Sequence, residues 1–181
     1  MKKNSIMFFT GISIFLIFVN VEIIQPSRGQ STQDFLVVND IKCEPGEHFT
    51  QHTHTQLKIF IKNGTEYTIP GFLGIIPEMR CIFWIHTHDN SGIIHIESPM
   101  ISNFTLGQFL SIWNYTQPID NHGILAKILM ETMKNNTNVF VNENKIDATK
   151  FKEIILNDKD TIIISEGQLP HNISLYYKPE K

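Results

Sequence analysis

C-I-F-W-I-H-T-H-D-N-S-G-I-I-H-I-E-S-P, residues Cys81–Pro99, is the stretch from which the expected fold follows. Two apolar-rich runs, Ile82–Thr87 and Ile93–Ser98, flank the turn signal Asp-Asn-Ser-Gly at Asp89–Gly92. Apolar runs of this length on either side of a short polar turn are typical of a β-hairpin. The sequence therefore predicts two antiparallel strands joined by a tight turn.

Three histidines would meet on one face of this hairpin. Side chains alternate between the faces of a strand, so His86 and His88 share a face. A loop of two or four residues at the centre of the turn places His95 opposite His86, at about 5 Å between Cβ atoms. Three neutral imidazoles form a ligand set for a transition-metal ion. The carboxylates Asp89 and Glu97 are close enough to act as further ligands or as hydrogen-bond partners of the ligands.

A second pair of histidines precedes an apolar run. His52 and His54 lead directly into Leu57–Lys62, and in a single strand both would lie on the face opposite Leu57. Antiparallel pairing with the hairpin would bring both pairs onto one sheet face. We therefore expect one site with three or four imidazole ligands, namely His86, His88 and His95 with His52 or His54. The alternative is that all are hydrogen-bonded surface residues, which is how we interpret His48, His122 and His171.

Length and composition fit one domain or two small subdomains. The chain has 181 residues, of which 41% are hydrophobic and 18% charged, so it can bury a real core. A formal net charge of −3 and the lack of a basic run give no support for nucleic-acid binding. We divide the chain into an N-terminal segment (1–29), a His-rich β-hairpin region (30–117) and an α+β C-terminal region (118–181).

The N-terminal segment has the pattern of an export signal. Lys2 and Lys3 precede an apolar run of 14 residues, Ile6–Val19, which suits a secretory signal peptide better than a spanning helix. Residues 1–29 are expected to be either a cleaved signal peptide or a retained N-terminal anchor. Either one would place the rest of the chain outside the cytoplasm, secreted or anchored to the outer face of the membrane. An anchor would be the protein's only contact with the membrane.

Two further features fit an exported protein. Cys43 and Cys81 would form one disulfide in an oxidising compartment. Because each lies five residues before a histidine, a thiolate metal ligand is the alternative. Asn-x-Ser/Thr sequons, which indicate a glycoprotein, begin at Asn63, Asn103, Asn114, Asn135 and Asn172.

Helical spacing occurs twice after the hairpin. Thr105 is a candidate N-cap for a short helix over 104–113, and Asn121–Lys134 predicts a second helix. The polar turn at 157–160 before an apolar strand is similar to the late hairpin of β-grasp domains. We predict an α+β fold, an antiparallel sheet with hairpins and two helices, with a β-grasp-like C-terminal part. Its expected late strands are Val139–Val141, Lys150–Leu156, Thr161–Ser165 and Ile173–Tyr177.

The sequence names no reaction, because it lacks an H-E-x-x-H helix, a Gly-x-Ser-x-Gly elbow and a phosphate loop. Three histidines with an open coordination position would make a catalytic zinc site. Four without one would make a storage, transfer or structural site. Whether the protein is an enzyme therefore stays open. No catalytic residue is assigned, and Asp89 or Glu97 would be the candidate acid/base.

The motifs of this region also resemble those of a known family. His52-x-His54, His86-Thr87-His88-Asp89-x-Ser-Gly, the following Ile-His-Ile-Glu-Ser-Pro and Thr105-Leu-Gly-Gln-Phe are similar to motifs in small exported prokaryotic proteins, largely archaeal. The resemblance covers about Lys42–Asn114. It implies export and a functional histidine cluster, and it supplies no reaction because the family's activity is not established.

Three functions follow from these patterns. The first is an exported metal-binding protein that buffers or delivers copper or zinc through its histidine cluster. The second is a metal-dependent extracytoplasmic enzyme whose ligands are His86, His88 and His95. The third is a glycosylated surface or adhesion module without metal. The sequence indicates a metal ion as partner and names no protein partner.

Overall fold

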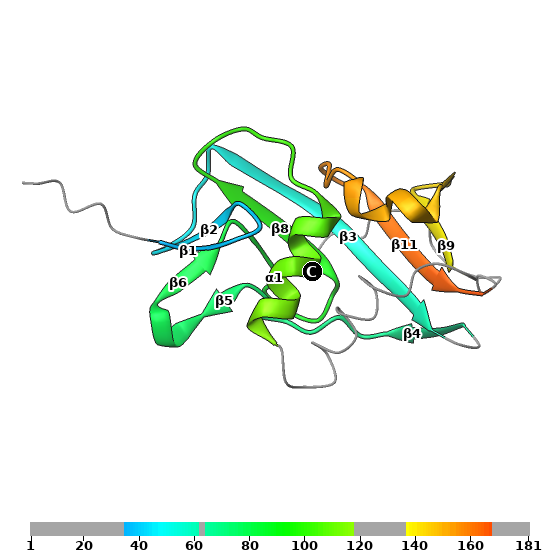
Figure 1. The fold of residues 1–181 in the computed structure, drawn as a ribbon, viewed down its shortest axis with the longest axis horizontal. Coiled ribbons are helices and arrows are strands. Elements are labelled where there is room, and N and C mark those ends of the chain that lie inside the picture. The colour runs from blue at the N-terminus through cyan, green and yellow to red at the C-terminus, as the bar shows by residue number, and fades with distance from the viewer. Residues whose placement is uncertain (1–34, 62–63, 118–136, 168–181) are drawn as a thin grey trace, which may run out of the picture. The chain divides into compact units, whose positions relative to one another are not determined.

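The computed structural model describes residues 35–61, 64–117 and 137–167 (Figure 1). These residues form two β-sheets and an α-helix, and the predicted α+β class is confirmed. The helical elements are α1 (Leu106–Thr116) and the 3-10 turns η2 (Pro77–Met79) and η3 (Ala148–Glu153). The strands are β1 (Leu36–Val38), β2 (Ile41–Glu44), β3 (Gln51–Ile61), β4 (Thr65–Tyr67), β5 (Ile75–Ile76), β6 (Cys81–Phe83), β7 (Ile85–His86), β8 (Ile93–Ser98), β9 (Thr137–Val141), β10 (Asn144–Ile146) and β11 (Thr161–Glu166).

The larger sheet is built around the long strand β3. Its order is β10-β9-β11-β3-β8-β7, and β4 pairs with the far end of β3. The hairpin predicted from the turn signal is formed by β7 and β8, and β3 lies antiparallel on the other side of β8. One pair departs from the antiparallel pattern, because β11 runs parallel to β3 with Thr161 opposite Gln56. The sheet is therefore mixed.

The sheet has the strand order of a β-grasp arrangement. A parallel pair, β3 and β11, lies at the centre with β8 on one side and β9 and β10 on the other, and α1 follows β8. The sequence predicted this likeness for the C-terminal part alone. It extends to the histidine-bearing strands because β11 pairs with β3. Strands from the expected regions 30–117 and 118–181 thus share one sheet.

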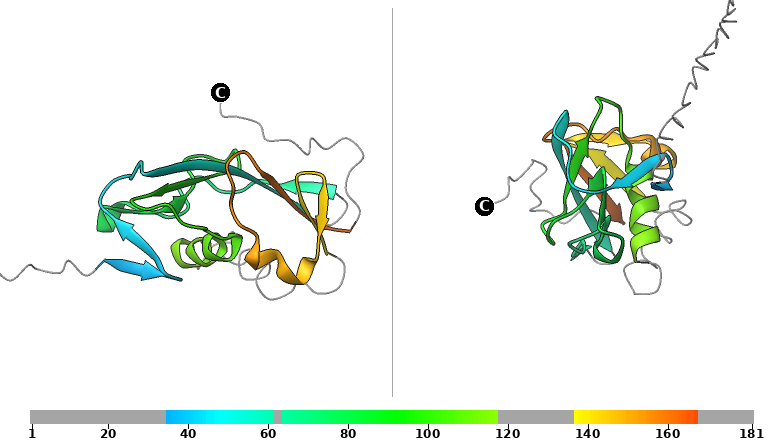
Figure 2. Two further views of the ribbon diagram at one scale, coloured as in Figure 1. Left: turned by 90° about the horizontal axis from the view of Figure 1, so that it is seen from above. Right: turned by 90° about the vertical axis from the view of Figure 1, so that its left-hand side faces the viewer.

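The core lies between the larger sheet and the layer formed by α1 and η3, both of which cover the same face (Figure 2). Thr105 caps α1 as expected: its side chain accepts from the Gln108 N–H, and the Gln108 side chain accepts from the Thr105 N–H. The predicted apolar face of α1 is fully buried, as are the residues of β8 that point toward it. These residues are Leu106, Phe109, Leu110, Trp113, Ile94 and Ile96.

The smaller sheet has the order β1-β2-β6-β5, and the predicted disulfide between Cys43 and Cys81 joins β2 to β6. The sequence predicted one strand over Ile82–Thr87, but the structure breaks it at Trp84 into β6 and β7. The Trp84 indole packs near Phe104 and donates to the Glu44 carboxylate. Because Trp84 belongs to this core contact, the chain leaves the smaller sheet there and enters the larger one.

The prediction of a strand over Lys150–Leu156 is wrong. The chain forms η3 instead, and only Ile155 makes an isolated bridge, to Thr105. Asp147 starts the turn, since its side chain accepts from the Thr149 N–H and favours a helical first turn. Phe151 then turns into the core. Three predicted segments lie outside the described residues: the N-terminal segment 1–29, the helix Asn121–Lys134 and the strand Ile173–Tyr177. No helix within the described part is long and apolar enough to cross a membrane.

We expect replacement of Cys43 and Cys81 together by Ala to lower the free energy of unfolding by about 4 kcal/mol. The bond joins residues 38 positions apart, and opening a loop of that length enlarges the conformational entropy of the unfolded chain. Urea denaturation of the oxidised protein and the double variant measures the difference, with the reduced wild-type protein as control. A change below about 1 kcal/mol would contradict this role for the bond.

Candidate metal centre

A row of three histidines crosses three neighbouring strands. His95 on β8 lies directly opposite His86 on β7, which is the register that the hairpin pattern predicted. On its other side His95 lies opposite His54 on β3. Directly opposite residues place their side chains on the same face of a sheet. The three imidazoles therefore converge on one face.

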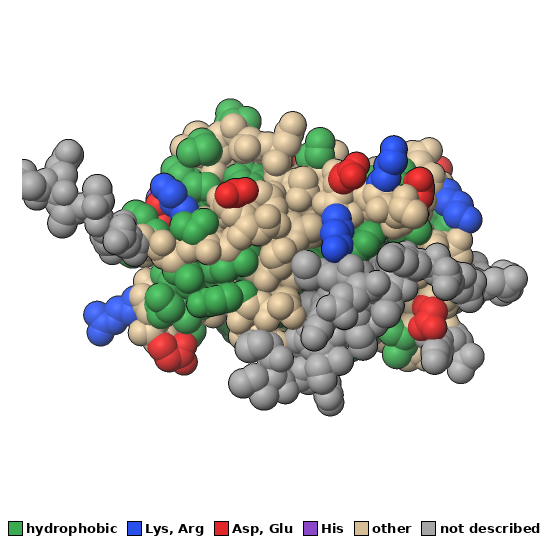
Figure 3. All heavy atoms as spheres, in the orientation of Figure 1, with side chains coloured by type: hydrophobic (Ala, Val, Ile, Leu, Met, Phe, Trp, Pro, Cys, Tyr) green, Lys and Arg blue, Asp and Glu red, His purple; other side chains and the backbone are tan. Residues whose placement is uncertain are grey.

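A second row follows one step along the strands. His52 on β3 lies opposite Glu97 on β8, two residues from His54 and His95 respectively. Because residues two apart share a face, this row adds an imidazole and a carboxylate to the same surface. The intervening Ile94 and Ile96 belong to the core under α1. The histidine face is thus the one opposite α1, and the α1 side shows no histidine on its described surface (Figure 3).

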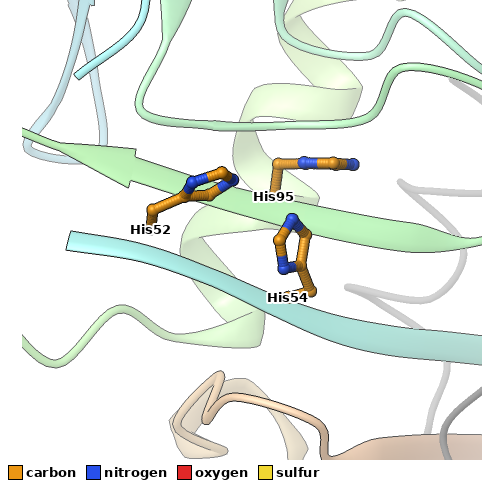
Figure 4. Close-up of side chains that lie close together, drawn as sticks. All are labelled: His52, His54 and His95. Atoms are coloured by element: carbon orange, nitrogen blue, oxygen red, sulfur yellow. The ribbon is translucent and has the colours of Figure 1, made fainter. Parts of the chain in front are cut away.

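His52, His54 and His95 form a compact group, which we call the three-histidine group (Figure 4). One nitrogen from each residue can be chosen so that all three lie within 4.8 Å of one another. The ring centroids of His54 and His95 are 4.6 Å apart, and those of His52 and His54 are 4.8 Å apart. Three imidazole nitrogens at such separations can share one ion with small side-chain adjustments.

Glu47, His86, His88 and Glu97 form a second group, which we call the mixed group. Its four donor atoms also lie within 4.8 Å of one another. The Nε2 atoms of His86 and His88 are 3.3 Å apart, and His88 Nε2 is 3.8 Å from the Glu47 carboxylate. Two imidazoles and two carboxylates are a common donor set for a divalent transition-metal ion.

The tautomer of His86 is determined by its backbone partner. Its Nδ1 lies 2.9 Å from the carbonyl oxygen of Phe83. Since a carbonyl can only accept, Nδ1 carries the proton and the neutral ring has its lone pair on Nε2. That lone pair points toward His88 and Glu97. A hydrogen bond from Nδ1–H to a backbone carbonyl is the usual way in which proteins orient a metal-binding imidazole.

Burial keeps His86 neutral. Its side chain is fully buried, and loss of contact with water lowers the pKa of His86 to about 3. The hydrogen bond to Phe83 raises this pKa, and charge on His88, His95 and His52 lowers it again. Glycine at position 74 allows close packing against β7, because a Cβ there would lie 2.7 Å from the Ile85 carbonyl oxygen and 3.0 Å from the His86 Cβ, and Gly74 has a φ of +80°.

Glu97 is a buried carboxylate among imidazoles. Its side chain is only 4% exposed, and burial, followed by the negative charge of Glu47, raises its pKa. Oε1 lies 3.3 Å from His52 Nε2 and 3.8 Å from His95 Nδ1, and Oε2 lies 3.8 Å from His86 Nε2. Oε2 is buried and has no hydrogen-bond partner among the described residues. A carboxylate oxygen buried in this way is costly unless a cation or a donor compensates it.

The two groups open to solvent on one side. The side chains of His52, His88 and Glu47 are 42%, 39% and 35% exposed, whereas that of His86 is buried. An ion can therefore reach the exposed donors first and then the buried ones. The pocket of about 150 Å³ that the structure describes nearby is lined by residues such as Leu57, Glu66 and Gly92 and includes none of these donors.

The candidates Asp89, Cys43 and Cys81 take other roles. Hydrogen bonds from the Ser91 side chain and then from the Ser91 N–H, both within the hairpin turn, lower the pKa of Asp89, and Asp89 belongs to neither group. The cysteines are bonded to each other, so neither is a thiolate ligand. His48 lies outside both groups, as expected, and its Nε2 is 2.7 Å from the Glu44 carboxylate. His122 and His171 lie outside the described residues.

Glu47 was missed by the sequence analysis. It follows the turn after β2 and approaches His88 through the folding of the smaller sheet against the larger one. The only local signal was its place in an acidic and histidine-containing stretch, Glu44–His48. Nothing in that stretch indicates which strand end it will meet.

Comparison of the chain with protein-family models, with curated proteins and with solved structures found no match. Function must therefore be inferred from the chemistry of the two groups.

We expect the metal-free protein to lose about 2 kcal/mol of unfolding free energy through His86 when the pH falls from 7 to 5. The pKa of His86 is about 3 in the folded protein and near 6.5 in the unfolded chain, so the unfolded chain binds more protons in this range. The raised pKa of Glu97 acts in the opposite direction. Denaturation of the wild-type protein and of His86→Asn at both pH values, with a chelator present, measures the contribution of His86 to the unfolding free energy. A His86→Asn variant with an unchanged pH slope would contradict it.

Proposed function

We propose that this protein binds a divalent transition-metal ion, copper or zinc, in its histidine cluster and buffers or delivers it outside the cytoplasm. The observation that carries the proposal is a pair of buried acceptor atoms that lie close together. Nε2 of His86 must accept because Nδ1 donates to Phe83, and it lies 3.8 Å from Oε2 of Glu97, which has no hydrogen-bond partner among the described residues. A cation coordinated between these atoms would compensate the buried carboxylate oxygen and take the imidazole as a second ligand.

The donor set favours Zn(II) or Cu(II) over Cu(I). Imidazole nitrogens and carboxylate oxygens suit divalent ions, whereas Cu(I) prefers thiolate and thioether sulfur. Cys43 and Cys81 are bonded to each other, and neither group contains a sulfur donor. The half-exposed donors would also let the ion exchange with solvent or with an acceptor, which storage and delivery require.

The disulfide is compatible with an extracytoplasmic location, because such bonds persist in oxidising compartments. The proposal places the protein there, either secreted after removal of residues 1–29 or anchored through them. The resemblance of the histidine motifs to those of exported prokaryotic proteins supports the same location.

We expect the full chain, purified without a polyhistidine tag, to retain at least one equivalent of Zn(II) or Cu(II). Replacing His86 and His88 together by Ala should weaken binding of the ion held by these two residues by more than about 100-fold, because even the partners of metal ligands contribute 10- to 100-fold. Elemental analysis and competition titration with Zn(II), Cu(II) and Cu(I) provide the readout.

The matched control is His122→Ala with His171→Ala, which removes two histidines that the sequence analysis interprets as surface residues. It should bind as the wild type does. Metal at background level in the wild-type protein would overturn the proposal and leave the surface-module interpretation. Equal loss in both double variants would show that binding reflects histidine content alone.

A further inference from the structure

The two donor groups do not overlap. The three-histidine group contains His52, His54 and His95, while the mixed group contains Glu47, His86, His88 and Glu97. Together they offer seven side chains on one sheet face and its rim. A zinc ion in a protein takes four ligands in most structural sites. A single ion with four ligands would leave three of these seven donors without an ion.

The groups are also adjacent. The ring centroids of His88 and His95, one from each group, lie 4.3 Å apart, and the rings of His86 and His95 stack at 5.6 Å. Ions held in the two groups would therefore be near neighbours. A shared anionic ligand between them would reduce the repulsion of two positive charges so close together.

Glu97 lies where such a ligand is needed. Its Oε1 faces the three-histidine group, 3.3 Å from His52 Nε2 and 3.8 Å from His95 Nδ1. Its Oε2 faces the mixed group, 3.8 Å from His86 Nε2. The backbone holds the side chain in place, since the Glu97 N–H donates to the Trp84 carbonyl and β8 pairs with β3 on its other side.

We propose that the centre binds two divalent metal ions bridged by the carboxylate of Glu97. The first ion takes the three-histidine group and Oε1, and the second takes His86, His88, Glu47 and Oε2. Each ion then has four protein donors, the number found in tetrahedral sites. Ions that share a carboxylate in this way lie roughly 3.5–4 Å apart in proteins. The inference rests on the proposed metal binding and specifies its stoichiometry and geometry.

The two-ion arrangement differs from the single site that the sequence predicted. A single site would combine His86, His88 and His95 with His52 or His54. The structure instead groups the His95 nitrogen with His52 and His54. The number of ions bound per chain separates the two arrangements. With a single shared ion, a substitution in either group would weaken all metal binding. With two ions, a substitution in one group would remove only the ion of that group.

The test uses Cu(II) and Zn(II) salts with the full, untagged chain. We expect two equivalents per chain by elemental analysis after dialysis, and an electron paramagnetic resonance spectrum of the copper form that shows interaction between two Cu(II) ions. His52→Ala and His88→Ala are a matched pair, since both side chains are about two-fifths exposed and neither is part of the core. Each should bind one equivalent, with an uncoupled copper spectrum.

Glu97→Gln tests the bridge, and Glu153→Gln at the exposed end of η3 is its control. The Glu97 variant should weaken the second equivalent at least tenfold and remove the coupling, while the control changes neither. Circular dichroism of each variant confirms that it is folded. If Glu97→Gln unfolds, the His52→Ala and His88→Ala pair still decides the stoichiometry.

Other results overturn the inference. One equivalent in the wild-type protein, weakened by both His52→Ala and His88→Ala, would show a single shared ion and leave the proposed function intact. Two equivalents without magnetic interaction would show separate sites and exclude the Glu97 bridge. Zero equivalents would overturn the proposed function together with this inference.

Discussion

The register in which β8 lies between β3 and β7 is the constraint on which the candidate metal centre depends. It places His95 between His54 and His86, and it sets Glu97 opposite His52. Side chains alternate along a strand, so a slip of one residue in either pairing would turn these groups toward the core under α1. The hydrophobic residues of β8 prevent that slip, because they must face α1. The same packing that builds the core therefore orients the donors on the opposite face.

This arrangement has an energetic cost in the absence of an ion. His86 is buried in its neutral form, with its proton held on Nδ1 by the Phe83 carbonyl, and Glu97 is buried beside it with one oxygen lacking a hydrogen bond. Burial of such groups destabilises a fold unless something compensates them. The disulfide between Cys43 and Cys81 supplies stability close by, just before the chain enters β7. A bound cation would compensate these buried groups and so stabilise the folded state, since a ligand that binds only the folded state stabilises it.

Several features near the site depend on contacts that no local pattern reveals. The expected strand over Ile82–Thr87 is interrupted because Trp84 packs near Phe104 and bonds to Glu44. Glu47 reaches His88 only because the two sheets meet at that point. In each case the deciding partner lies far away in the sequence. Apolar alternation and turn residues report on neighbours a few positions apart and carry little information about such partners.

The sequence by itself determined the local elements: the hairpin turn, the pairing of His86 with His95, the Thr105 cap of α1 and the cysteine pair. Each depends on turn chemistry, alternation or capping within a short segment, or on a choice limited to two cysteines. Only the tertiary structure decided that β11 joins β3 in parallel and that His95 is grouped with the histidines of β3. Those outcomes depend on which strands lie side by side once the core is packed, and that is a property of the whole chain.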